Sequence, residues 1–368
     1  MHVVCAPDSF RGTMTASEAA RAMAAAITAA EPAWSVDACP VGDGGEGTLE
    51  AIVEAAGGRY EHVPVIGPDG STLTARLGWL AAGSTAFVEL AEASGLTRLS
   101  NPPDPTRTTT YGTGQLIAAA AAARTIIVGL GGSATCDGGV GMTQALGGRF
   151  EVDDGRTLTT PITGGALERL TRVELPTLAS RVRVACDVTN PLLGPDGAAA
   201  VYGPQKGATP AQVIQLERGL AHLATLLGGD RDQPGAGAAG GVGFMLATLG
   251  ATLERGIDLV LDLVEFPARV AAADLVITGE GRLDATSLNG KACVGVAHAA
   301  ANAGVPTIAI AGVVDADAAD AVRSPRGPLA ACVGIAGRVG VERAFADTAA
   351  ALGETTVAAI RAWSARIR

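Results

Sequence analysis

Short apolar segments that end in loops rich in glycine and aspartate recur along this chain, and a helix-like segment follows each of the first two. Residues 2–7 (HVVCAP) lead into DSFRGTM, and residues 36–41 (VDACPV) lead into GDGGEGT and then TLEAIVEAA. The stretch TASE at 15–18 matches a capping box, which satisfies the first backbone N–H groups of a helix. This strand–loop–helix order predicts right-handed βαβ units and a parallel sheet.

The pattern changes near residue 60 and returns after about residue 265. In between, Pro68-Asp69-Gly70 and Asp153-Asp154-Gly155 each separate two strand-like segments and predict hairpins, the second between RFEV and RTLT. A chain of 368 residues is long enough for roughly two domains. We therefore expect an α/β fold in which residues 1–65 and 265–368 form a parallel-sheet domain and residues 66–264 form an inserted, mixed α/β domain.

Composition excludes several classes of protein. The chain has 27 Lys and Arg against 37 Asp and Glu, a net charge of −10, and only 3% aromatic residues, which disfavours binding to nucleic acid or to a membrane surface. Its six Cys and four His show no metal-ligand spacing, so a structural zinc site is not expected. Residues 233–253 and 292–314 lack charged side chains but contain Gly and Pro, so they are interpreted as buried α/β segments. With no signal-peptide pattern at the start, we expect a cytoplasmic protein with reduced cysteines.

Glycine-rich loops also carry most of the polar groups that could do chemistry. They are APDSFRG (6–12), GDGGEGT (42–48), GGSATCDGG (131–139), CDVTNPLLGP (186–195) with GPQKGA (203–208), and TGEGRLDATSLNGK (278–291). Their carboxylates are Asp8, Asp43, Glu46, Asp137, Asp187, Glu280 and Asp284. Any one such loop is more often a turn than a site, but carboxylates near glycine-rich anion cradles together indicate a Mg²⁺-nucleotide site.

Lysine is scarce, since Lys206 and Lys291 are the only two in the chain. Both lie in these glycine-rich loops, where a compact ammonium group could pair with phosphate oxygens. The alternative is that each is a solvated surface charge.

Familiar catalytic motifs are absent. The sequence has no G-x-x-x-x-G-K-[ST], no G-x-S-x-G and no H-E-x-x-H. GAGAAG at 235–240 fits G-x-G-x-x-G, with Glu254 and Asp258 at about the distance expected of a ribose-binding acid, but no strand-like segment precedes it. A nicotinamide-dependent oxidoreductase is therefore one alternative, with close backbone packing the simpler explanation of the glycines. A non-catalytic two-domain ligand-binding protein is another.

A specific resemblance rests on the order of these motifs. APDSFRG-TMTA, DGGEGT, YGTGQLI, GLGGSATCDGG, CDVTNPLLGPDGAAAVYGPQKGA, GAGAAGGVGF and ITGEGRLD…GK follow one another from residue 6 to residue 291. Together they resemble the bacterial type I glycerate kinase family. The resemblance implies a flavodoxin-like domain with an inserted α/β domain, and ATP-dependent phosphorylation of glycerate, usually at the 2-hydroxyl. The chain departs from the family where Arg11 replaces Lys, Cys136 replaces Asn, Thr286 replaces Gln and Cys293 replaces Pro.

Phosphoryl transfer then suggests a role for each polar group. We expect Asp187 to be the base, with Lys206 and Asp284 as further catalytic groups. The expected substrate-binding residues are Asp8, Ser9, Arg11, Asn190 and Arg282. The expected nucleotide-binding residues are Gly131, Gly132, Ser133, Asp137 and Lys291, and the expected Mg²⁺ ligands are Asp43, Glu46 and Glu280. The partners are then glycerate and ATP, and a homodimer remains open.

Overall fold

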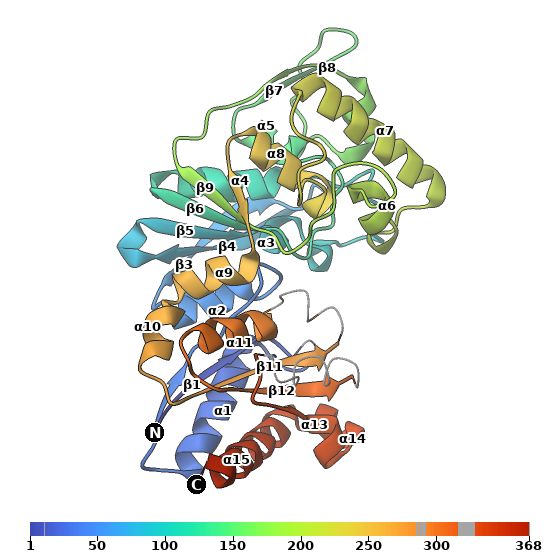
Figure 1. Cartoon of the computed structure of the whole chain (residues 1–368). Coiled ribbons are helices and arrows are strands. Elements are labelled where there is room, and N and C mark those ends of the chain that lie inside the picture. The colour runs from blue at the N-terminus through green and yellow to red at the C-terminus, as the bar shows by residue number, and fades with distance from the viewer. Residues whose placement is uncertain (11, 285–286, 288–291, 316–327, 368) are drawn as a thin grey trace. The chain divides into compact units, whose positions relative to one another are not determined.

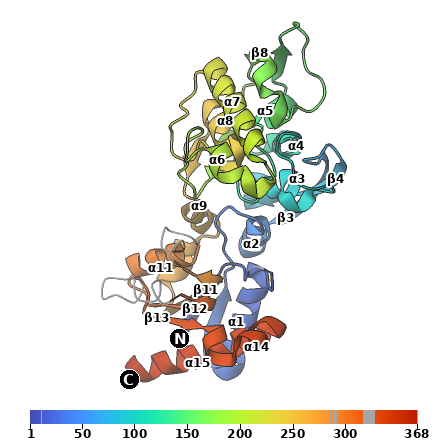
Figure 2. The same ribbon diagram turned by 90° about the vertical axis from the view of Figure 1, so that its right-hand side faces the viewer.

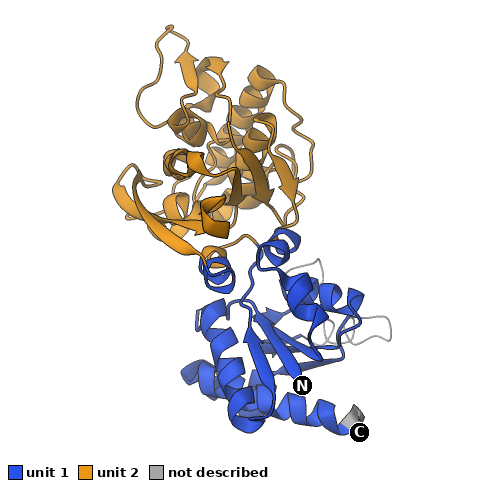
Figure 3. Cartoon of the chain, turned by 90° about the vertical axis from the view of Figure 1, so that its left-hand side faces the viewer, with its two compact units in different colours: residues 1–43, 50–57, 257–368 blue, residues 44–49, 58–256 orange. Residues whose placement is uncertain are grey.

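The structure is a computed structural model that describes residues 1–10, 12–284, 287, 292–315 and 328–367 (Figure 1). These residues form two compact units, coloured separately in Figure 3. Unit 1 comprises Met1–Asp43, Glu50–Gly57 and Ile257–Arg368, and unit 2 comprises Gly44–Leu49 and Gly58–Gly256. Both ends of the chain therefore belong to unit 1, and the short segment Gly44–Leu49 belongs to unit 2 although unit 1 flanks it on both sides.

Unit 1 is built on a five-stranded parallel sheet. Its strands are β1 (His2–Pro7), β2 (Ser35–Ala38), β11 (Leu275–Leu283), β12 (Thr307–Val314) and β13 (Ala331–Gly334). They lie in the order β13-β12-β11-β1-β2, and every neighbouring pair is parallel. Read from β2, this is the flavodoxin-like order 2-1-3-4-5. The expected fold class, a flavodoxin-like sheet built from both chain ends, is confirmed.

Helices pack against this sheet, whose strands have apolar faces. The helices in contact with its strands include α1 (Ala16–Ala30), α11 (Ala292–Asn302), α13 (Ile335–Val339) and α15 (Thr348–Ile367). The other helices are α10 (Phe266–Ala271), α14 (Val341–Ala346), and α2 (Thr48–Ala55) and α9 (Gly256–Leu263), whose first residues belong to unit 2. Ile308 and Ile310 of β12 pack in a cluster with side chains of α1 and α15, which lie side by side in Figures 1 and 2. Ala309 and Ala311, on the opposite face, pack with α11.

Capping boxes start two of the helices, and the one at 15–18 was predicted from the sequence. The Thr15 hydroxyl oxygen accepts from the N–H of Glu18 at the start of α1. The Glu18 carboxylate accepts in turn from the N–H of Thr15, which completes the capping box. Thr209 caps α7 (Pro210–Leu227) in the same way through Gln212, with proline at the first helical position. Local chemistry therefore sets where both helices begin.

Unit 2 contains a six-stranded mixed sheet. Its strands are β3 (Arg59–Ile66), β4 (Thr72–Leu80), β5 (Thr85–Glu89), β6 (Thr125–Gly129), β9 (Arg181–Ala185) and β10 (Thr252–Glu254), in the order β10-β9-β6-β5-β4-β3. The β3–β4 hairpin predicted around Asp69 is confirmed, and β4 also runs antiparallel to β5. The pairs β5–β6, β6–β9 and β9–β10 are parallel.

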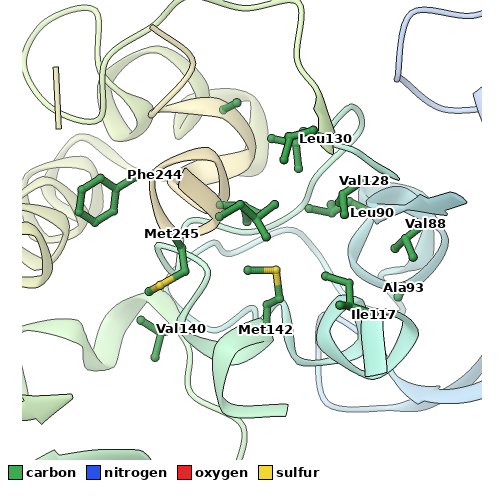
Figure 4. Close-up of a cluster of buried hydrophobic side chains, with 14 of the residues drawn as sticks. Val88, Leu90, Ala93, Ile117, Val128, Leu130, Val140, Met142, Phe244 and Met245 are labelled. Carbon is green, nitrogen blue, oxygen red and sulfur yellow. The ribbon is translucent and has the colours of Figure 1, made fainter. Parts of the chain in front are cut away.

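Helices and one large core complete unit 2. The α-helices are α3 (Leu90–Ser94), α4 (Tyr111–Ala119), α5 (Val140–Ala145), α6 (Ala198–Tyr202), α7 and α8 (Val242–Thr248). The 3₁₀ turns are η1 (Ala81–Gly83), η2 (Leu96–Arg98), η3 (Ala120–Ala122), η4 (Gly164–Arg169), η5 (Pro204–Lys206) and η6 (Ala238–Gly240). Figure 4 shows strand residues Val88 and Val128 in this core with Met142 and Met245. The core thus joins the sheet to α5 and α8.

The second predicted hairpin forms as a short one. The N–H of Val152 donates to the carbonyl of Arg156 at 3.1 Å, the N–H of Leu158 donates to that of Phe150 at 2.9 Å, and Glu151 forms an antiparallel bridge with Thr157. The sequence analysis did not predict that β7 (Arg149–Val152) also pairs with β8 (Leu170–Glu174), which forms the longer ladder. Leu170 of β8 is fully buried in the same cluster as Phe150 of β7, whereas RTLT at 156–159 is mostly exposed, so apolar burial favours the pairing with β8.

The two uncharged segments lie inside the α/β architecture. Residues 292–314 include α11 and β12, and residues 233–253 include η6 and α8. Among the described residues, no helix has both the length and the apolar character needed to cross a membrane.

Candidate active site

Three predicted site residues gather at the carboxyl edge of the unit 1 sheet. Asp8 follows β1 directly, and its backbone N–H donates to the carbonyl of Gly279 in β11 at 2.8 Å. Glu280 follows Gly279 in the chain and is buried, with 8% of its surface exposed. The N–H of Val41 donates to the carbonyl of Pro7 at 3.0 Å, which brings the segment before Asp43 to the same edge. Ligands of open parallel sheets bind at this end of the strands.

A buried thiol lies next to these carboxylates. Cys293, in the first turn of α11, is fully buried. Burial, followed by the charge of Glu280 and more weakly that of Asp8, raises the pKa of this thiol far above its ordinary value. Cys293 therefore remains protonated and serves as a small packing group rather than as a nucleophile.

Two predicted residues at the end of β11 and just after it make local contacts. The guanidinium of Arg282, in β11, pairs with both carboxylate oxygens of Asp315, each at 3.0 Å. The carboxylate of Asp284, which directly follows β11, accepts from the N–H of Ser287 at 3.2 Å. Near the other strand end, the N–H of Ser9 donates to the Asp8 carboxylate at 2.6 Å. Arg11, Thr286 and Lys291 lie outside the described residues.

In unit 2, Asp137 is a buried anchor at the centre of the GGSATCDGG loop. Its carboxylate accepts four hydrogen bonds, from the N–H and hydroxyl of Thr110, both at 2.8 Å, and from the N–H groups of Gly139 and Gly141 at 3.1 and 3.2 Å. Complete burial nevertheless raises its pKa, and the four donors act in the opposite direction. The geometry makes Asp137 a group that fixes the loop.

Lys206 is buried next to the same loop, so its interpretation as a solvated surface charge is wrong. Only 3% of its surface is exposed. Its ammonium donates to the hydroxyl of Ser133 and to the carbonyl of Thr135, both at 2.6 Å. An ammonium group can only donate, so the Ser133 oxygen is an acceptor here and its own O–H can donate to another group.

Burial lowers the pKa of Lys206 from 10.5 to about 8. Between these two values the unfolded chain binds a proton that the folded protein has released, so stability should rise with pH across this window. We expect the free energy of unfolding of the wild type to increase, relative to that of Lys206→Met, between about pH 7.5 and about pH 10. Urea unfolding of both proteins at the two pH values measures this difference. Parallel curves would show that the ammonium is not desolvated in solution.

Glycines let two loops of unit 2 touch through their backbones. The N–H of Gly131 donates to the carbonyl of Gly44 at 3.1 Å. A Cβ atom on Gly131 would lie 2.3 Å from the Cα of Gly45, and one on Gly129 would lie 2.7 Å from the carbonyl oxygen of Gly44. The Gly131 N–H, which was expected to meet phosphate, is therefore used to hold the DGGEGT loop. Gly132 is exposed and has a positive φ of 73°, which favours glycine.

Asp187 follows β9, and its exposed carboxylate accepts a hydrogen bond from the backbone. The N–H of Gly256 donates to Asp187 Oδ1 at 2.8 Å. Asn190, in the same loop, accepts from the Tyr202 hydroxyl at 2.6 Å and donates to the carbonyl of Asp196 at 2.8 Å. Both side chains are thus in contact with other parts of unit 2, and that of Asp187 is exposed.

The GAGAAG segment packs these loops together. A Cβ atom on Gly237 would lie 2.2 Å from the carbonyl of Pro191, and one on Gly240 would lie 2.1 Å from that of Thr135. The residues just before the segment form turns rather than a strand, and Glu254 pairs with Arg183. The strand–turn–helix context of a dinucleotide fingerprint is therefore missing in the described residues around 235–240.

Cys136 lies inside the same packing. It is fully buried, and a Cβ atom on Gly240 would lie 2.6 Å from its Cα. Burial raises the pKa of its thiol to about 11. The Cys136 thiol therefore stays protonated and uncharged.

Sequence reasoning missed two buried carboxylates, Glu89 and Glu92. Glu89 ends the buried strand β5 and accepts from the N–H groups of Gly47 and Leu49 at 3.0 and 2.8 Å. Glu92 accepts from the guanidinium groups of Arg76 and Arg98 at 2.6 and 2.9 Å. For Glu89, the available signal was its position within STAFVEL (84–90), where an acidic residue directly follows the apolar run AFV.

The metal-binding side chains do not form a ready-made cage. Among the described residues, no group of three or more His, Cys, Asp or Glu side chains is arranged to hold a metal ion. Mg²⁺ that accompanies a nucleotide needs only one or two carboxylates, because phosphates and water supply the other ligands. Glu280 lies at the sheet edge and Asp43 on the adjoining segment, and each carries carboxylate oxygens of the kind that Mg²⁺ binds.

Known proteins resemble this chain along nearly its whole length. A profile described as the glycerate kinase family matches residues 3–364. A glycerate kinase of Bacillus subtilis (strain 168) is 47% identical over 331 residues, 86% of each chain. A glycerate 2-kinase of Escherichia coli (strain K12) is 42% identical over 331 residues, again 86% of each.

A solved structure gives the same result in three dimensions. The crystal structure of a Salmonella typhimurium LT2 protein, titled as a candidate glycerate kinase 2, is 40% identical, with a TM-score of 0.84 and 99% coverage of both chains. The motif order, the two-unit fold and these similarities agree, and the chain belongs to the glycerate kinase family.

Proposed function

We propose that this protein transfers the terminal phosphoryl group of ATP to glycerate, at the 2-hydroxyl, to give 2-phosphoglycerate. The observation that carries the proposal is the 42% identity, over 86% of both chains, to the Escherichia coli protein named glycerate 2-kinase. In this reaction the glycerate oxygen forms a bond to the terminal phosphorus, the bond from that phosphorus to the bridging oxygen of ATP breaks, and the hydroxyl proton passes to a base.

Asp187 is the proposed base. Its carboxylate is exposed, so a substrate hydroxyl can reach it, and the Gly256 N–H holds one of its oxygens in place. A positioned carboxylate is a suitable acceptor for the proton that leaves during transfer. Asp284, whose carboxylate is held in a local turn, is the second choice.

Ser133 and Lys206 are the proposed phosphate contacts of unit 2. Lys206 supplies positive charge next to the glycine-rich loop. Because its ammonium donates to the Ser133 oxygen, the Ser133 O–H points away from Lys206 and can donate to a phosphate. Gly132, exposed beside Ser133, adds a backbone group of the same loop. Donors fixed before the reaction stabilise charge that develops on the transferring group. Asp137 supports the proposal by holding this loop rather than by meeting the nucleotide itself.

Most of the proposed metal and substrate contacts belong to unit 1, and Glu46 and Asn190 belong to unit 2. Mg²⁺, when bound, neutralises charge on the phosphates and orients them. Asp43, Glu46 and Glu280 are the proposed ligands. Asp8, Ser9 and Arg11 are proposed for glycerate, since an Arg fork suits a carboxylate. Arg282 already pairs with Asp315 and would have to exchange that partner for the substrate. Asn190 is likewise engaged within its loop and stays a weaker substrate candidate.

The test is a reaction with ATP, Mg²⁺ and a panel of small hydroxy acids, with the product identified by phosphorus and proton NMR. We expect phosphorylation of glycerate at the 2-position, and loss of turnover after chelation of divalent metal that returns when Mg²⁺ is added. Product at the 3-position would overturn the regiochemistry. Full turnover after exhaustive chelation would overturn the metal requirement, and no phosphorylated glycerate at all would overturn the proposal.

A further inference from the structure

Glu89 is a buried carboxylate that none of the proposed catalytic steps uses. It ends β5, and only 2% of its surface is exposed. Its Oε1 accepts from the N–H of Gly47 at 3.0 Å, and its Oε2 accepts from the N–H of Leu49 at 2.8 Å. One side chain therefore caps two backbone donors at the start of α2 from a distant part of the sequence.

Burial of this group is costly. Desolvation raises the pKa of Glu89 to about 7, with the nearby charge of Glu92 acting in the same direction and that of Arg76 against it. An apolar side chain of similar volume would avoid this cost. What the carboxylate provides instead is geometry, because each of its two oxygens accepts from a different N–H group.

The segment that Glu89 holds is short and carries proposed metal ligands. Gly44–Leu49 belongs to unit 2, whereas Asp43 before it and Glu50 after it belong to unit 1. Gly131 holds the start of the segment through the carbonyl of Gly44, and Glu89 holds its end. Glu46 lies between these two attachments and Asp43 directly precedes them.

We propose that Glu89 is a positioning residue for phosphoryl transfer, and that it fixes the backbone of Gly44–Leu49 so that Asp43 and Glu46 meet the metal and the nucleotide phosphates. The inference rests on the proposed function, which assigns those two carboxylates to the metal. Glu89 itself touches neither substrate nor metal in this proposal. Its effect passes through the two backbone N–H groups that it holds.

The test compares Glu89→Gln with the wild type. In the present geometry a glutamine places an amide NH₂ where one carboxylate oxygen accepts, so one of the two N–H groups loses its acceptor. At about pH 8.5, above the pKa of Glu89, and in the metal-free protein, we expect amide hydrogen exchange in the peptide that covers 44–49 to be about tenfold faster in Glu89→Gln, because one hydrogen bond to a charged acceptor is lost. In the enzyme, we expect the Mg²⁺ concentration for half-maximal rate to rise about tenfold while kcat changes less than about threefold.

Ile162→Val is the matched control. Ile162 is buried in the unit 2 core, and its shortening costs stability without touching the segment. We expect its exchange at 44–49 and its Mg²⁺ dependence to equal those of the wild type. If Glu89→Gln cannot be recovered folded, Glu89→Asp retains the charge but shortens the reach and should show the same two changes.

The possible results distinguish the positioning role of Glu89 from the proposed glycerate kinase activity. If the wild type phosphorylates glycerate and Glu89→Gln keeps the wild-type exchange and Mg²⁺ dependence, Glu89 has no positioning role. Equal shifts in Ile162→Val would likewise overturn the inference, because they would reflect lost stability alone. If the wild type does not phosphorylate glycerate, the proposed function fails and the positioning role fails with it.

Discussion

Replacing Asp187 with asparagine is expected to lower kcat by about two to four orders of magnitude, the usual contribution of a general base. The amide retains an oxygen that can accept from the N–H of Gly256, so the loop and the fold should be preserved. What the substitution removes is the basicity and the charge. Steady-state rates with saturating ATP, Mg²⁺ and glycerate, together with a circular dichroism spectrum of the variant, measure both parts of this expectation.

Asp196→Asn is the control for this prediction, because Asp196 lies exposed on the same loop and its side chain has no proposed role. It should turn over at the wild-type rate. A metal-ligand role for Asp187 would also lower kcat, but it would raise the Mg²⁺ requirement at the same time. A folded Asp187→Asn enzyme with wild-type kcat would move the base assignment to Asp284 or Asp43.

Asp137→Ala is expected to lower the free energy of unfolding by about 3 kcal/mol, the scale of a broken buried hydrogen-bond network. The substitution leaves the N–H and hydroxyl of Thr110 and the N–H groups of Gly139 and Gly141 without their shared acceptor. Because these donors are buried, water replaces the carboxylate poorly. Urea unfolding at neutral pH measures the loss.

Asp153→Ala provides the comparison. The Asp153 side chain is 71% exposed and lies 3.9 Å from Arg169, so its removal should change stability by less than about 0.5 kcal/mol. Equal stability losses in the two variants would mean that the Asp137 contacts contribute nothing beyond a surface ion pair.

Much of the fold follows from local patterns that tertiary contacts reinforce. The apolar run of β1 and the capping box of α1 are visible in the sequence, and both form where expected. The β3–β4 hairpin forms around Asp69 for the same reason. The pairing of β7 with β8 was not predictable from a turn signal, because it depends on which distant segment can bury an apolar residue beside Phe150.

The candidate site was less accessible to sequence reasoning. Composition and spacing indicate which loops are polar. They do not indicate which polar groups form hydrogen bonds or ion pairs within the protein. The Asp137 carboxylate and the Gly131 N–H are used within unit 2, and Arg282 pairs with Asp315. Lys206 shows the opposite case, since a residue type that is normally exposed is buried against a loop. Burial and partner choice are properties of the folded chain.

The division of unit 1 between the two ends of the chain has a consequence for folding during synthesis. The N–H of His2 donates to Asp274, 272 residues later, so β1 cannot pair with β11 until most of the chain has been made. The strands of unit 2, residues 59–254, are contiguous, so all of them have been made before β11 (Leu275–Leu283) is synthesised. Unit 2 is therefore able to fold first, because domains generally fold as units as the chain emerges. Until β11 is made, the edge of β1 that later pairs with β11 has no partner strand. Unpaired strand edges of this kind promote aggregation in partly folded chains, which chaperones counteract.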